Sequence, residues 1–323
     1  MKHVIIILIF LIYNFTAMGQ TIRFYDAETN EPVSFATVSF GDGLGAFANA
    51  DGEFLFQKKR YPDVDTLFVS ALGYADLKLV TTELEPAYAM QQEIDQLKEV
   101  VITTARKGKF KTRETKPVSH NDYHNSWLQT VESEIAVLFR KQEAKPTQLA
   151  TLRLPINVKE AVSGKNISVR KFSTLMRVKF YENENGKPGS EISYGNIVFV
   201  ITEKEEKEIF ELDISANNIF IPENGMFVSI QVLGPTDASG NLIQTKTYNE
   251  YKTRRGLEKI AVSFRPLLPL TNQIRGQQTF VRRIFFNNKK WQVFDFNYNP
   301  NSVLLRKGYN NYGMGAELRV YED

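Results

Sequence analysis

Residues 33–40 read Val-Ser-Phe-Ala-Thr-Val-Ser-Phe, an alternation of apolar and small polar side chains. Ala36, Val38 and Phe40 fall on one side of an extended chain, because successive side chains of a strand point to opposite faces. The β-branched and aromatic residues in this stretch are also those that strands favour. The stretch therefore predicts a β-strand that buries one of its two faces.

The segments on either side repeat this pattern. Short apolar stretches recur at residues 22–25, 53–56, 65–71 and 97–103, and turns rich in Gly, Pro, Asn and Asp separate them. None of them has the 3.6-residue period of a long helix. Residues 20–102 are therefore expected to form a small all-β domain.

Three of these segments also carry a family resemblance. They are residues 33–38, residues 50–54 (Ala-Asp-Gly-Glu-Phe) and residues 69–74 (Val-Ser-Ala-Leu-Gly-Tyr). In order and spacing they resemble the carboxypeptidase regulatory-like domain. Residues 97–102, Leu-Lys-Glu-Val-Val-Ile, are similar to the strand that often follows this domain in envelope proteins of the Bacteroidetes type. The resemblance implies a seven-stranded, transthyretin-like β-sandwich over residues 20–102, which serves as an accessory module without catalysis.

Residues 1–19 have the features of a secretory signal peptide. A short polar start, Lys2-His3, precedes an apolar run at 4–15, and Ala17-Met18-Gly19 offers small residues for cleavage. The run is shorter than the ~20 residues that a membrane-spanning helix needs. We therefore expect an exported chain without a transmembrane span after signal cleavage. Its expected location is the periplasm, the outer membrane or the cell surface of a Gram-negative bacterium of the Bacteroidetes type.

The segment 103–130 differs in composition from its neighbours. Residues 106–116 hold six basic residues against one acid, Glu114, and few apolar side chains. The segment is expected to be a solvated basic linker, with contact to an anionic surface as the alternative. Within it, His120, Asp122 and His124 would share one face of a strand and could hold a zinc ion, but a polar linker gives no rigid frame for ligands.

The remaining residues, 131–323, are expected to form a larger β-sandwich of the jelly-roll type. Strands are predicted at residues 149–158, 175–181 and 226–233, with Pro residues between several of them. Residues 126–140 fit either a helix or a strand. The part around residues 177–230 resembles, more weakly, an envelope sandwich domain whose function is unassigned.

Basic and aromatic residues are concentrated near the end of the chain. Residues 246–323 contain 14 Lys and Arg against 6 Asp and Glu, whereas the whole chain has a net charge of only +3. Six of these basic residues are candidates for contact with a ligand or partner: Arg254, Arg255, Arg282, Arg283, Lys289 and Lys290. Three aromatic residues are candidates for stacking on sugar rings: Trp291, Tyr309 and Tyr312.

The sequence lacks the residues or motifs that several classes of chemistry require. The chain has no Cys, which excludes disulfides, thiolate metal sites and cysteine nucleophiles. It has no Gly-x-Ser-x-Gly, His-Glu-x-x-His or Walker motif either. We therefore expect no enzyme and no cofactor. Since a glycosidase needs only two carboxylates, a glycoside-processing enzyme with unlocated carboxylates stays open.

The expected function is that of a non-catalytic, exported envelope protein. It would bind or scaffold an envelope protein or a surface polysaccharide, and nucleic acid is not expected as a partner. A carbohydrate-binding protein of the cell surface is the sharper alternative. Such a protein would present a coplanar pair of exposed aromatic rings, whereas an enzyme would place two carboxylates in a cleft. The oligomeric state is left open.

Overall fold

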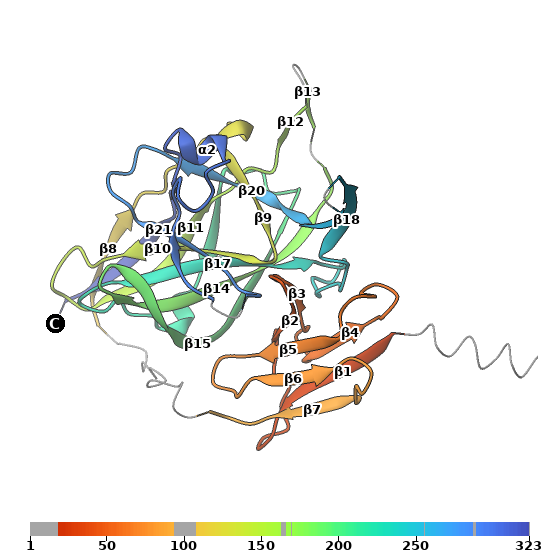
Figure 1. Cartoon of the computed structure of the whole chain (residues 1–323). Helices are drawn as coiled ribbons and strands as arrows, with labels where there is room; N and C mark the ends of the chain where they lie inside the picture. The colour runs from red at the N-terminus through yellow and green to blue at the C-terminus, as the bar shows by residue number, and fades with distance from the viewer. Residues whose placement is uncertain are drawn as a thin grey trace, which may run out of the picture.

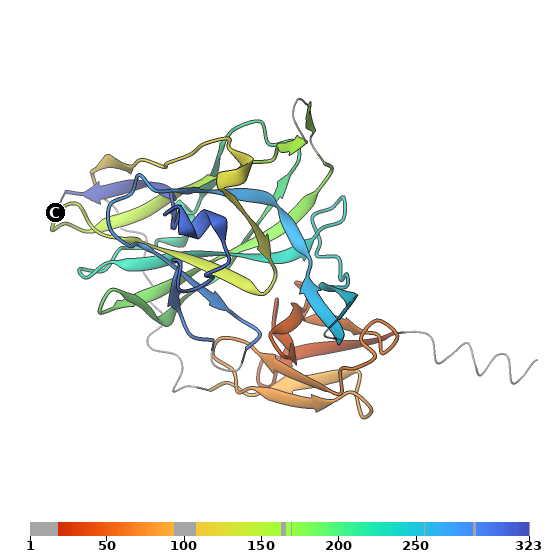
Figure 2. The same ribbon diagram turned by 45° about the horizontal axis from the view of Figure 1, so that its top comes forward.

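The computed structural model describes residues 19–93, 108–162, 166–168, 170–254, 256–286 and 289–322. The expected signal peptide, apart from Gly19, and the stretch at 97–102 thus lie outside the described residues. Strands dominate the described chain, and α2 (Val303–Arg306) is its one α-helix. Figures 1 and 2 show two bodies side by side, a small one and a large one. The prediction of an all-β chain with a small sandwich followed by a larger one is confirmed.

The small domain consists of two sheets that enclose an apolar core. One sheet has the order β4-β1-β7 and the other β3-β2-β5-β6. Alternate residues of each strand point inward, so that Ile22, Val38 and Leu67 are completely buried between the sheets. The strands are β1 (Gln20–Asp26), β2 (Thr37–Gly41), β3 (Leu44–Phe47), β4 (Glu53–Phe56), β5 (Thr66–Ser70), β6 (Leu77–Val80) and β7 (Ala87–Met90).

The large domain is built around a six-stranded sheet with the order β15-β14-β17-β10-β21-β22. A four-stranded sheet, β16-β11-β24-β8, and a three-stranded one, β23-β20-β9, complete its framework. These strands are β8 (Phe110–Thr115), β9 (Ser126–Thr130), β10 (Ser133–Phe139), β11 (Thr147–Pro155), β14 (Ser173–Glu184), β15 (Lys187–Thr202), β16 (Ile209–Asp213), β17 (Met226–Pro235), β20 (Ser263–Thr271), β21 (Thr279–Arg283), β22 (Gln292–Val293), β23 (Asn311–Tyr312) and β24 (Gly315–Tyr321).

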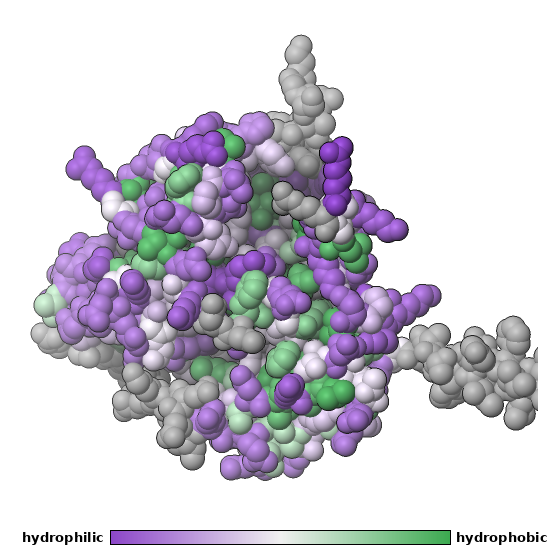
Figure 3. All heavy atoms as spheres, viewed as in Figure 1, coloured by the Kyte–Doolittle hydropathy of each residue, from purple (hydrophilic) through white to green (hydrophobic). Residues whose placement is uncertain are grey.

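Two hairpins and two short 3-10 turns extend from this framework. The hairpins are β12 (Glu160–Val162) with β13 (Asn166–Ser168) and β18 (Tyr248–Thr253) with β19 (Gly256–Ala261). The turns are η2 (Tyr123–Asn125) and η3 (Ser215–Asn217). In the view of Figure 3 the surface is mainly hydrophilic, and its hydrophobic side chains form small groups.

The main core of the large domain lies on one face of the six-stranded sheet, which we call the inner face. Ile135, Val178 and Ile230 on this face are almost completely buried in one apolar cluster with Leu152 of β11 and Leu318 of β24. The alternate residues of the same strands lie on the opposite, outer face. The small domain lies against part of that outer face, as described for the site below.

The two domains share a tight interface. The β3 backbone approaches the large domain so closely that a Cβ atom on Gly45 would lie 2.5 Å from the ring of Phe285. Ser39 donates a hydrogen bond of 2.7 Å to the carbonyl oxygen of Phe285. Tyr248 begins β18 of the large domain, but its ring is fully buried in the core of the small domain, 5.9 Å from the ring of Tyr61.

Two predictions for the middle of the chain are settled by the strand pairing. The described part of the expected linker, 103–130, is not a linker, because β8 pairs with β24 and β9 pairs with β20. The linker prediction is wrong because β8 is an exposed edge strand with charged side chains. Its composition resembles that of a solvated linker. Residues 126–140, which fitted either a helix or a strand, form strands β9 and β10.

None of the helices in the described part of the chain has the length and apolar character needed to cross a bilayer.

Candidate functional site

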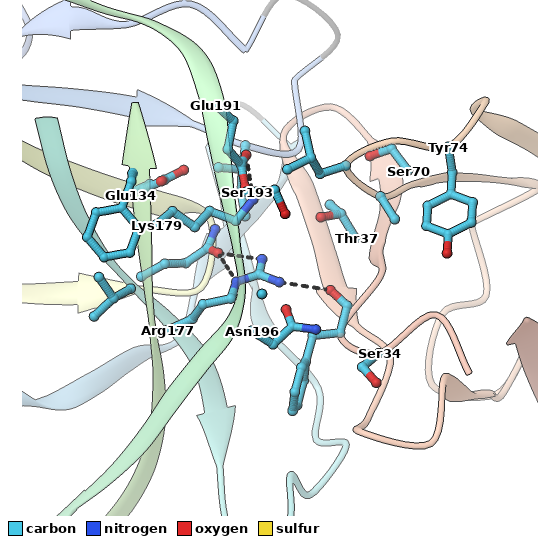
Figure 4. Close-up of a pocket in the computed structure, with 18 of the residues that line it drawn as sticks. Ser34, Thr37, Ser70, Tyr74, Glu134, Arg177, Lys179, Glu191, Ser193 and Asn196 are labelled. Atoms are coloured by element: carbon cyan, nitrogen blue, oxygen red, sulfur yellow. Dashed lines mark hydrogen bonds and ion pairs between the residues drawn. The ribbon is translucent and has the colours of Figure 1, made fainter. Parts of the chain in front are cut away.

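A cavity of about 410 Å³ lies between the two domains. The small domain contributes residues 32–37 and 70–76 to its wall, and the large domain contributes the outer face of the six-stranded sheet and part of β15. Figure 4 shows Ser34, Thr37 and Ser70 on the small-domain side, facing Arg177 and Lys179 of β14. The size is in the range of sites for small ligands.

Strand register places a polar row across the sheet beneath this cavity. Arg282 of β21 is opposite Glu134 of β10, Glu134 is opposite Gln231 of β17, and Gln231 is opposite Arg177 of β14. Cross-strand partners point to the same face of a sheet, so the four side chains form one line on the outer face. The line carries two guanidinium groups and one carboxylate.

Glu134 is fully buried and has a partner at each carboxylate oxygen. Its Oε1 accepts hydrogen bonds from the hydroxyls of Tyr181 at 2.7 Å and Ser229 at 2.6 Å, and its Oε2 accepts one from Arg282 at 2.8 Å. Burial raises the pKa of this carboxyl, but Arg282, Lys179 and the hydroxyl donors outweigh it and hold the pKa below its usual value. Glu134 is therefore a fixed negative charge.

A second carboxylate, Glu191 of β15, is also neutralised. Lys179 lies 2.8 Å from its Oε2 in an ion pair with both side chains mostly buried. The Tyr181 hydroxyl, already hydrogen-bonded to Glu134, is 3.3 Å from the same Oε2. Glu134 and Glu191 thus lie close together, within reach of one hydroxyl, and each has its own cation.

Arg177 differs from the other cations of the cavity. It is 5% exposed, and its hydrogen bonds go to two neutral acceptors, the side-chain oxygen of Gln231 (2.7 and 3.2 Å) and the carbonyl oxygen of Phe35 (3.2 Å). No carboxylate within the described chain forms an ion pair with it. Burial lowers the pKa of Arg177, because the charged form loses hydration, and Glu191 and Glu134 offset this only from a distance.

One wall of the cavity is a bulge in β15. Ile197 pairs with Val178 and Ile192 pairs with Phe180, so Lys179 alone on β14 faces the four residues 193–196 on β15. Gly195 supports the bulge with a φ of +78°, a conformation that other residues rarely adopt. The bulge carries Ser193 and Asn196 to the rim of the cavity.

The basic candidates do not form a single patch. Arg282 and Lys289 line the cavity, and the ammonium of Lys289 donates to the Ser70 hydroxyl at 2.9 Å. Arg283 and Lys290 line a neighbouring surface depression of about 530 Å³, where Arg283 pairs with Glu132 at 2.8 Å. Arg254 is exposed at the end of β18, away from β21 in Figure 1, and Arg255 lies outside the described residues.

The aromatic candidates are not exposed sugar-stacking rings. Tyr312 is fully buried and donates to the carbonyl oxygen of Pro155 at 2.8 Å, because β23 lies inside the large domain. Tyr309 is partly buried against the main core. Trp291 is also partly buried and meets the ring of Tyr181 edge to face at 5.2 Å, with Arg282 over its own ring. The exposed aromatic rings of the described chain, Phe110, Tyr251 and Phe296, lie on separate segments.

The structure does not bring His120, Asp122 and His124 together as ligands of one zinc ion. The His120 ring is held between the carbonyl oxygen of Leu270 at 2.7 Å and the backbone N–H of Asp122 at 3.1 Å. Asp122 caps the turn η2 by accepting from the backbone N–H of His124. No group of three His, Asp or Glu side chains is placed to hold a metal ion in the part of the chain that the structure describes.

Sequence reasoning missed Arg177, Lys179 and Glu134 as site residues. The predicted strand 175–181 already places Arg177 and Lys179 on one face, and this is the signal that could have found them. A charged strand face ordinarily lies in water. Here the second domain and the β15 bulge cover it, and no local pattern reports such a contact.

No protein-family model and no curated protein matches this sequence. One solved structure with some likeness contains the cysteine protease and lectin-like domains of Cwp84, a surface layer associated protein of Clostridium difficile. It has 10% identity and a TM-score of 0.36, and the match covers 65% of this chain and 36% of that chain. Another is the clostridial cysteine protease Cwp84 after propeptide cleavage, with 9% identity, a TM-score of 0.34, and coverage of 94% and 71%. This chain thus spans only about a third of the first structure.

Proposed function

We propose that this chain is a non-catalytic, exported binding protein of a bacterial envelope, and that the cavity between its two domains is the binding site. The observation that carries the proposal is that both domains contribute polar side chains to one cavity of about 410 Å³. The small domain, proposed as a carboxypeptidase regulatory-like module, acts as one wall of the site. The proposed ligand belongs to an envelope protein or a surface polysaccharide.

The state of the two carboxylates supports binding over catalysis. A glycosidase needs one carboxyl that gives up a proton and a second that attacks or activates water. Glu134 is held ionised by Arg282 and two hydroxyl donors, and Glu191 is paired with Lys179. The lowered pKa of Glu134 makes it a poor proton donor near neutral pH, and the ion pair with Lys179 engages the carboxylate of Glu191. The pair is therefore better suited to fixing the charges of a binding site.

A capture experiment with a blocked cavity tests this proposal. The full chain is used to pull down partners from detergent-solubilised envelope of the source bacterium and to probe a polysaccharide array. The variant Ser193→Trp fills the cavity from the β15 bulge, and Ser239→Trp makes the same change in an exposed turn. The expected result is a partner or glycan that Ser193→Trp loses and Ser239→Trp retains. Equal capture by both variants would place the binding site elsewhere.

A further inference from the structure

We propose that the cavity binds an acidic saccharide, with a carboxylate of the sugar placed against Arg177. The inference rests on the function proposed above, since it names the ligand class of the same cavity. Three observations carry it: the balance of charge in the wall, the unused donors of Arg177, and the neutral polar groups at the rim.

The wall of the cavity carries one more cation than it has anions. The cations are Arg177, Lys179, Arg282 and Lys289, and the anions are Asp76, Glu134 and Glu191. Glu134 forms an ion pair with Arg282 and Glu191 forms one with Lys179, so neither pairs with Arg177. A buried charge without a partner is costly, and an anion brought by the ligand would remove that cost. The arrangement therefore favours a ligand with a single negative charge.

Arg177 keeps donors for such an anion. A guanidinium has five N–H groups. Arg177 gives one from Nε and one from Nη2 to Gln231, and one from Nη1 to the carbonyl oxygen of Phe35. One N–H on each terminal nitrogen remains. Two hydrogen bonds from a guanidinium are the usual way in which arginine holds a carboxylate.

The charge pattern favours a carboxylate over a phosphate. A phosphate monoester carries close to two negative charges at neutral pH. Its second charge would lie beside Glu134 and Glu191, which are fixed on the same wall of the cavity. A carboxylate supplies the one charge that Arg177 lacks and is repelled less by Glu134 and Glu191 than a doubly charged phosphate.

The rim of the cavity suits the hydroxyl groups of a sugar. Thr37, Ser193 and Asn196 line it with neutral side chains that can both donate and accept. Within the described part of the chain, no hydrogen bond engages these three side chains. Two come from the bulge and one from the small domain, so both domains supply them. A sugar ring that carries hydroxyl groups and one carboxylate complements these neutral side chains together with Arg177.

Titration calorimetry with the full chain tests the inference, using glucuronate, polygalacturonate, glucose and inorganic phosphate as probes. We expect at least one of the two acidic saccharides to bind, and glucose and phosphate to bind at least about tenfold more weakly. Arg177→Met should weaken acidic-saccharide binding about 10- to 100-fold, the range for hydrogen bonds to a charged group. The exposed Arg254→Met is the matched control and should leave binding unchanged.

A second variant covers the case in which Arg177→Met does not fold. Asn196 is exposed at the rim, so Asn196→Leu should fold and weaken binding of the acidic saccharide several-fold. Preferential binding of phosphate, or equal binding of glucose and glucuronate, would overturn the acidic-saccharide inference. The proposed function would still stand if Ser193→Trp lost its captured ligand. Failure of all four probes, together with unchanged capture by Ser193→Trp, would overturn both proposals.

Discussion

The two faces of the six-stranded sheet are both buried but differ in chemistry. On the inner face, Ile135 and Ile230 are completely buried in an apolar core. On the outer face lie their sequence neighbours, Glu134 before Ile135 and Gln231 after Ile230. They are almost equally buried but belong to a hydrogen-bonded polar row. The same strands therefore supply an apolar framework on one side and a buried row of charged and polar side chains on the other.

This difference shows what each face contributes. An apolar face gains stability from the area it removes from water. A buried polar face gains little net stability and depends on complete pairing, because an unpaired buried charge is strongly unfavourable. Arg177, which is hydrogen-bonded to neutral acceptors and has no carboxylate partner in the described chain, is thus the least completely paired charge of the outer face.

The largest effect is expected from Glu134→Gln. The substitution keeps the shape of the side chain but leaves Arg282 without its counter-charge in a buried position, which costs about 3–5 kcal/mol of unfolding free energy. Urea denaturation measures the change. Glu223→Gln is the control, because Glu223 is 80% exposed in its ion pair with Lys141 and such pairs contribute at most about 1 kcal/mol. Similar losses in both variants would contradict a special role for the buried row.

The same charge should make stability depend on pH. Because the pKa of Glu134 is held below its ordinary value of 4.5, the carboxylate stabilises the folded state above about pH 4.5. This contribution is lost as the pH falls from there through the lowered folded pKa. The unfolding free energy of the wild type should therefore fall more steeply on acidification below pH 4.5 than that of Glu134→Gln. Parallel pH profiles would show that Glu134 is not a fixed charge.

A smaller effect is expected where the small domain covers the outer face. In Gly45→Val the added side chain would collide with the ring of Phe285 and with the carbonyl oxygen of Val38 in the neighbouring strand, and such overpacking costs about 1–3 kcal/mol. Gly108→Val is the control, because a Cβ atom there meets only Tyr321 at 3.8 Å. Hydrogen exchange should also become faster in β14 and β15 of the Gly45 variant. Unchanged exchange there would indicate that the small domain does not protect the outer face.

The smallest effect is expected on the inner face. Ile135→Val removes one methylene from the apolar core and should cost about 0.5–1.5 kcal/mol, without any change in pH dependence. Ile260→Val makes the same change at a side chain that is 54% exposed and should stay within about 0.5 kcal/mol of the wild type. A shifted pH profile in Ile135→Val would mean that the two faces are coupled through the sheet.

Local patterns predicted the strands but not the role of each face. The alternation at 33–40 and 175–181 gave strands near β2 and β14, because period-two patterning is a property of the chain itself. The burial of Arg177 depends on Phe35, which lies 142 positions away in the sequence. The composition of the charged edge strand β8 is that of a linker, and composition alone does not show its pairing with β24. The β15 bulge has one local signal in the sequence, Gly195, and an isolated glycine is not enough to predict a bulge of four residues.

The position of Tyr248 has a consequence for the order of folding. Tyr248, whose ring lies in the core of the small domain, is synthesised long after the last described strand of that domain, which ends at Met90. At ~5–20 residues per second of synthesis, the gap is on the order of ten seconds. Until then the first sandwich lacks one of the largest buried rings of its core. The core of the small domain is therefore complete only once the β18–β19 hairpin of the large domain has packed against it.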